Sequence, residues 1–131
     1  MFPRIDKGPI EYTLDIQRAW NKMERQECIR FQFKTMEEFN HFQYEISVDH
    51  ALRKGSIEFL LRGLTTKGML LPGSGQAESS IDLSGLEGKY RVAVSKPGPI
   101  TMEFTINITP KTVRIVEGVA AKASFLVVQA H

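Results

Sequence analysis

The chain has 131 residues, 42% of them hydrophobic, and its 17 Lys and Arg residues against 15 Asp and Glu leave a net charge of +2. This length is typical of one domain whose core is stable without disulfides or metal. The two signs of charge are interleaved along the chain, which argues against a basic stripe that would capture nucleic acid or anionic lipid. We therefore expect a single domain over residues 1–131 that binds no nucleic acid.

The single cysteine, Cys28, has no intramolecular partner for a disulfide. We interpret it as a reduced and buried thiol, which is typical of a cytoplasmic protein. Near the amino terminus, Pro3, Asp6 and Gly8 interrupt the apolar run that a secretion signal would need, and no segment approaches membrane-spanning length. These features predict a cytoplasmic protein without a membrane span.

Short segments that alternate between apolar and polar residues recur along the whole chain, with the period of two that a half-buried strand requires. Turn residues separate them, so the sequence predicts an all-β fold, an antiparallel β-sandwich of about eight or nine strands with a Greek-key or jelly-roll-like arrangement. At most one or two short helical segments are expected. The predicted strands are residues 10–16, 29–33, 42–48, 57–61, 81–83, 90–94, 100–108, 113–116 and 125–128.

Two segments allow a helix as well as a strand. The even-numbered apolar positions from 10 to 16 favour a strand up to Ile16, whereas Ile16, Ala19, Trp20 and Met23 also fit one face of a helix, so residues 14–26 stay open. Thr35, followed three residues later by a glutamate, is typical of a capping box and predicts a short helix near residues 36–41.

The hairpin between the sixth and seventh predicted strands turns at residues 95–99. Because directly opposed residues share a face, the pattern predicts three cross-strand pairs. They are Tyr90 with Phe104, Val92 with Met102, and Val94 with Ile100. The next turn, at residues 109–112, is expected to set Ile108 beside Val113.

Two apolar stretches are candidate binding surfaces. Met69, Leu70 and Leu71 lie in a Gly-rich loop, where they either cover an open end of the core or contact a partner chain or an apolar ligand. The second stretch is apolar at consecutive positions, so it is either covered on both faces or placed against another subunit. Its residues are Phe125, Leu126, Val127 and Val128.

Residues that carry chemistry do not form a recognisable motif. His41 and His50 flank the third predicted strand at opposite ends, and His131 is expected to be frayed at the chain end, so no pair is spaced for a metal ion. Cys28 is interpreted as inert core, and no serine lies in a nucleophile-elbow motif. The sequence predicts no catalytic residue, no metal and no cofactor.

The resulting prediction is a non-catalytic binding or assembly module that self-associates or binds a protein partner through its apolar loop and strand surfaces. Two alternatives stay open. One is a barrel or open-ended sandwich that holds a small apolar ligand. The other is a hydrolase-type enzyme whose acidic and histidine residues converge from separate loops, with Asp49 and His50 as the leading candidates.

Overall fold

The computed structural model describes residues 11–40, 43–66, 73–98, 100–118 and 125–131, and within these ranges it contains nine strands and no helix. Each of the nine predicted strands overlaps one of them, so the all-β prediction is confirmed. The strands are β1 (Tyr12–Asn21), β2 (Gln26–Phe39), β3 (Tyr44–Arg53), β4 (Ser56–Thr66), β5 (Gly75–Leu83), β6 (Gly88–Lys96), β7 (Ile100–Ile108), β8 (Val113–Glu117) and β9 (Leu126–Ala130). No helix in the described ranges is long and apolar enough to cross a membrane.

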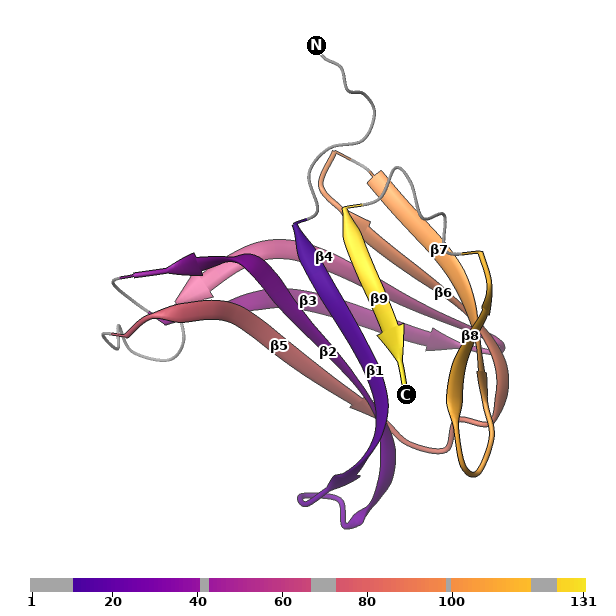
Figure 1. Ribbon diagram of the computed structural model, residues 1–131. Helices are drawn as coiled ribbons and strands as arrows, with labels where there is room; N and C mark the ends of the chain where they lie inside the picture. Colours follow the sequence, from indigo (N-terminus) through magenta and orange to yellow (C-terminus); the bar gives the residue numbers. More distant parts are fainter. Residues whose placement is uncertain (1–10, 41–42, 67–72, 99, 119–124) are drawn as a thin grey trace.

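All nine strands belong to one sheet, in the order β8-β7-β6-β4-β3-β5-β2-β1-β9. The sheet curls until its two edge strands, β8 and β9, touch locally without pairing, which makes a nearly closed barrel (Figure 1). The predicted two-sheet antiparallel sandwich is therefore wrong. The sheet is mixed, because β1 with β9, β3 with β5, and β4 with β6 are parallel neighbours.

The continuity of the sheet depends on one short link. Strand β3 pairs with β5 through Glu45 and Glu78, and the rest of each strand pairs elsewhere, β3 with β4 and β5 with β2. We call β9, β1, β2 and β5 the first arm, and β3, β4, β6, β7 and β8 the second arm. Alternation within a strand cannot reveal this link, because it fixes which residues face inward and not which strand lies alongside.

The inward faces of both arms meet in one hydrophobic core. The ring of Phe59, on β4, lies 5.1 Å from that of Phe31 and 5.2 Å from that of Phe33, both on β2, measured between centroids. Aromatic pairs at this separation add about 0.5–1.5 kcal/mol to the free energy gained from burial alone. The largest fully buried side chains are Leu14, Ile16, Phe31, Phe33, Ile46, Ile57, Phe59, Leu61, Phe104, Ile106, Ile108 and Leu126.

Both ambiguous segments are strands. β1 continues as a strand to Asn21, so the helical reading of residues 14–26 is wrong. The capping-box helix is also wrong, because β2 runs on to Phe39. Thr35 is buried there, and its hydroxyl accepts a hydrogen bond from the backbone N–H of Ala77 at 3.0 Å and donates one to the carbonyl of Glu37 at 2.8 Å. The Thr35 hydroxyl therefore links β2 to β5 and does not cap a helix.

The predicted register of the β6–β7 hairpin is wrong by two residues. Val92 lies opposite Phe104, Val94 opposite Met102, and Lys96 opposite Ile100. A shift of two residues leaves every side chain on its predicted face, which is why the hydrophobic pattern could not exclude it. The next turn is as predicted, and Ile108 pairs with Val113.

Candidate functional site

The β1–β2 hairpin projects beyond the body of the barrel (Figure 1). β2 pairs with β5 only from Ile29 onward, so the hairpin tip, residues 19–28, lies past the last β5 partner. The turn is held by its own hydrogen bonds. The N–H of Arg25 donates to the carbonyl of Asn21 at 2.7 Å, and the N–H of Glu24 donates to the Asn21 side-chain oxygen at 2.8 Å. The tip is therefore an ordered projection.

Two large apolar side chains are exposed on the tip: Trp20 is 55% exposed and Met23 is 93% exposed. Trp20 has the same parity on β1 as the buried residues Leu14 and Ile16, so it belongs to the inward-facing row at a point where the core has ended. Sequence reasoning left Trp20 open between a strand and a helical face, and it placed Met23 only on the helical face. Their alternation with the core residues was the signal for a strand, but nothing in it marks where the core stops.

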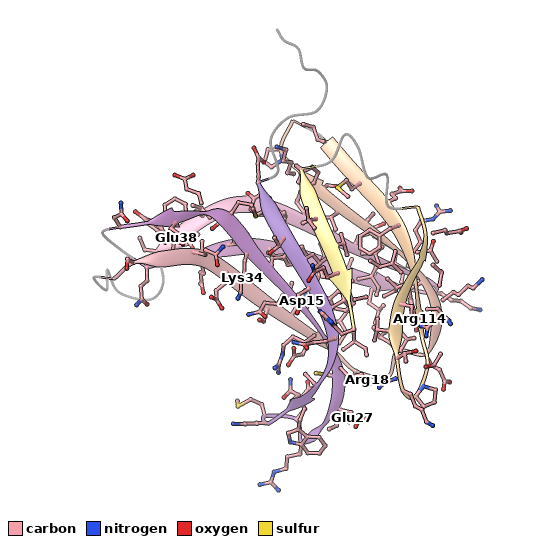
Figure 2. All side chains as sticks on the ribbon, viewed as in Figure 1. Asp15, Arg18, Glu27, Lys34, Glu38 and Arg114 are labelled. Carbon is pink, nitrogen blue, oxygen red and sulfur yellow. The ribbon has the colours of Figure 1, made fainter. Side chains whose placement is uncertain are left out.

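The tip carries two cations, Lys22 and Arg25, and two glutamates, Glu24 and Glu27, so it has no net charge. Lys22 and Arg25 flank Met23, and neither side chain forms an ion pair with another residue in the described ranges. Arg18, at the base of the tip, is already engaged: it lies 3.8 Å from the carboxylate of Glu27 and donates a hydrogen bond to the carbonyl of Thr109 (Figure 2).

A hollow of about 490 Å³ lies on the outer face of the second arm, across β3, β4, β6 and β7. We call it the outer hollow. Small side chains occupy several outward positions there: Ala51 and Ala93 lie on either side of Glu58 in one row across β3, β4 and β6, and Ser95 pairs with Thr101. The hollow is lined by Asp49, His50, Ala51, Glu58, Phe59, Leu60, Ala93, Ser95, Thr101 and Glu103.

The outer hollow is acidic. Asp49 pairs with Arg62, and the carboxylate of Glu58 lies 3.6 Å from the guanidinium of Arg53. All four side chains are exposed, so solvent weakens both ion pairs. Within the described part of the chain, Glu103 forms no ion pair. The hollow therefore mixes small and apolar side chains with carboxylates, and Glu58 stands between the two alanines.

Asp49 and His50, the leading residues of the hydrolase alternative, both line this hollow without forming a catalytic pair. The His50 ring packs 6.5 Å from the Phe59 ring, and among the described residues it has no hydrogen bond to a carboxylate or hydroxyl. The hydroxyl of Ser95 bonds to that of Thr101 at 2.9 Å. A nucleophile, a base and an orienting carboxylate within hydrogen-bond reach are the minimum for triad chemistry, and this arrangement does not supply them.

The outer face of the first arm is polar and largely paired with itself. Arg30 donates two hydrogen bonds to Asp82, at 2.8 and 2.9 Å, and Asn21 donates a third at 3.0 Å. The Arg30 guanidinium holds the pKa of the Asp82 carboxyl below its ordinary value. Beside them Cys28 is buried, as predicted, and burial together with the nearby Asp82 carboxylate raises the pKa of its thiol.

His131 is fixed in place, contrary to the prediction that it would be frayed. Its backbone N–H donates to the carbonyl of Ile16 at 3.0 Å, and its Nε2 lies 2.7 Å from an Asp15 carboxylate oxygen. Asp15 and Lys34 lie on the same outer face (Figure 2), beside a second hollow of about 320 Å³. No local motif could have indicated this pair, because its two residues lie on opposite ends of the chain and meet only through the parallel pairing of β1 with β9.

Of the two apolar stretches predicted as binding surfaces, the structure describes only the second. Met69, Leu70 and Leu71 lie outside the described residues. In the second stretch, Phe125 and Leu126 are buried in the core, Val128 is half-buried against it, and Val127 is 42% exposed on the outer side. The structure brings neither His50 nor Cys28 to a metal site, since no group of three or more possible ligands gathers within the described ranges.

Comparisons with protein-family models, with curated proteins and with solved structures find no match to this chain.

Proposed function

We propose that this protein is a non-catalytic binding and assembly module that self-associates, and that the edge of β9 at Val128 and Ala130 is one of its contact surfaces. The observation that carries the proposal is that β9 is the last strand of the sheet among the described residues, and that its residues 128–130 bear no charge and no proline. Natural edge strands are usually protected by one of these devices, because an open edge is a template for another strand.

The geometry of β9 identifies the groups that face outward. The N–H of Tyr12 donates to the carbonyl of Phe125, and the N–H of His131 donates to the carbonyl of Ile16, so odd-numbered residues of this segment bond to β1. In a parallel ladder the intervening residues turn their backbone groups to the other side. Val128 and Ala130 therefore direct their N–H and C=O groups away from β1, where the strand of a second copy can continue the sheet.

The packing of the barrel favours this proposal over the small apolar ligand. The inward positions of both arms are occupied by aromatic and aliphatic side chains that contact one another, and the hollows found among the described residues lie on the outer surface. A small-molecule site buries about 70–90% of its ligand's surface, whereas these hollows are open to solvent.

The experiment is light scattering over a range of concentrations with Val128→Pro and the matched control Val128→Thr. Proline removes an N–H that β1 does not use, whereas threonine keeps both that N–H and the branched shape. We expect the wild type and Val128→Thr to self-associate and Val128→Pro to shift toward monomer.

A strictly monomeric wild type would overturn the proposal. Because proline can also loosen β9, amide hydrogen exchange on the wild type gives a second measurement. The exchange of the Val128 and Ala130 amides is expected to slow as protein concentration rises, and unchanged exchange would contradict pairing at this edge.

A further inference from the structure

We propose that the strand which continues the sheet at β9 is β9 of a second copy, running antiparallel, with the two-fold axis at Gln129. This inference rests on the proposed self-association and names the partner strand and its register. In this pairing Gln129 lies opposite the partner's Gln129, and Val128 exchanges backbone hydrogen bonds with the partner's Ala130.

The register follows from the direction of the backbone groups of β9. Odd-numbered residues of this segment bond to β1, so Val128 and Ala130 direct their N–H and C=O groups away from it. In an antiparallel ladder, a hydrogen-bonded pair consists of two residues that both point these groups at the other strand. An axis at Gln129 sets Val128 opposite the partner's Ala130, and Ala130 opposite the partner's Val128, so both residues meet matching groups.

The side chains of β9 are compatible with this symmetry. A residue on a two-fold axis meets its own copy, so a charged residue there would oppose a like charge, whereas a glutamine amide both donates and accepts hydrogen bonds. Gln129 is exposed, and no residue of β9 is charged. Val127 is 42% exposed on the same outer face, and in this register it lies opposite the partner's His131, which covers it.

The other edge strand, β8, is a poorer partner for β9. Within one molecule the two strands touch locally, but no ladder joins them in the described ranges. β8 carries Arg114 and Glu117, and charged side chains are one of the devices by which natural edge strands resist pairing. Pairing of β9 with β8 of the next copy would also leave an open edge at each end and could continue without limit, whereas pairing of β9 with itself closes at a two-fold dimer.

Disulfide trapping tests the register. Opposed residues of an antiparallel pair without backbone hydrogen bonds have Cα atoms about 4.5 Å apart, within the range of about 4.4–6.8 Å found in disulfides. Gln129→Cys should therefore form a covalent dimer under mild oxidation, measured on a non-reducing gel. Val127→Cys should link about 10-fold less, because Val127 lies about 13 Å along the strand from the partner's Val127.

Controls separate this contact from chance collision. The wild type contains Cys28 alone, which is buried, so its yield gives the background from that thiol. Val116→Cys places a thiol on β8 at a side chain that is 44% exposed, comparable with Val127, and it should link no more than the wild type. An equimolar mixture of Val127→Cys and His131→Cys should form a mixed covalent dimer, since these positions oppose each other in this register.

A charge on the axis gives a reversible form of the test. Gln129→Lys opposes two ammonium groups, so it should raise the dissociation constant of self-association by up to about 5-fold at low salt, and by less at high salt. Sedimentation velocity is the measurement. The matched control Val116→Lys, on β8, should leave the dissociation constant unchanged.

The outcomes distinguish this inference from the proposed function. If the wild type self-associates but Gln129→Cys links no better than Val127→Cys, the register is different, and the inference fails while the proposed function stands. The same holds if a mixture of Val116→Cys and Gln129→Cys links more than Gln129→Cys alone, because β8 is then the partner strand. If the wild type is a monomer at every concentration, both fail.

Discussion

The two outer faces of the barrel are built on the same alternation and yet differ in what they leave open. On the first arm, long polar side chains pair across strands, as Arg30 does with Asp82 and His131 with Asp15. On the second arm, the corresponding outward positions include the small residues Ala51 and Ala93. The second arm also pairs Asp49 with Arg62 and Glu58 with Arg53, but through side chains that are more exposed than those of Arg30 and Asp82. An ion pair that is shielded from solvent contributes more to stability than an exposed one.

The largest expected effect comes from the residue that joins the two arms beneath both faces. Phe59→Ala removes the ring that contacts Phe31 and Phe33, and we expect a loss of about 3–5 kcal/mol in the free energy of unfolding. Chemical denaturation followed by fluorescence and by circular dichroism is the measurement. Coincident transitions are expected, and two separate transitions would mean that the arms unfold independently.

A direct comparison of the faces comes from neutralising one carboxylate on each. Asp82→Asn breaks a partly buried pair and leaves Arg30 without its partner, so it should cost about 1–3 kcal/mol. Glu103→Gln, on the second arm, should change the free energy of unfolding by no more than about 0.5 kcal/mol. Equal effects in denaturation experiments would remove the distinction between the two faces.

The cost of Asp82→Asn should also depend on pH. Arg30 lowers the pKa of Asp82 in the folded state below its ordinary value of 3.8, so the stabilisation is fully present above that value. It is lost as the pH falls through the folded-state pKa. The difference in stability between wild type and variant should therefore be constant near neutral pH and shrink below about pH 4. A difference that stays constant to lower pH would contradict this origin.

A small effect is also expected where the end of the chain meets β1. His131→Ala removes the contact with Asp15, but both side chains are solvent-exposed to a degree that limits such pairs to at most about 1 kcal/mol. Thermal unfolding at low and high salt is the measurement, and the effect should diminish at high salt. A larger and salt-independent loss would mean that His131 anchors β9 through packing.

Much of the fold could be predicted from alternation alone. All nine strands were located, but most of them were predicted too short, because tertiary pairing extends strands past the point where apolar residues stop alternating. The helix expected after Thr35 failed because its capping pattern depends on neighbours within four residues, whereas Ala77, far along the chain, provides the actual partner. Local patterns cannot anticipate such a competition.

The candidate sites were less accessible to sequence reasoning. The outer hollow combines Ala51, Leu60, Ala93 and Glu103 from four strands, and the tip is exposed only because the core ends before Trp20. Neither the grouping of these four residues nor the point where the core ends can be recognised within a single segment of the sequence.

The sequence by itself determined which residues form strands and which face each side chain takes, because a strand's period of two is a local property of the backbone. Only the tertiary structure decided that β3 joins β5, that the sheet curls into a nearly closed barrel, and that Val92 lies opposite Phe104. The physical reason is that strands pair through backbone N–H and C=O groups, which are the same in every residue except proline. Strand order and register are therefore selected by the packing of the whole core.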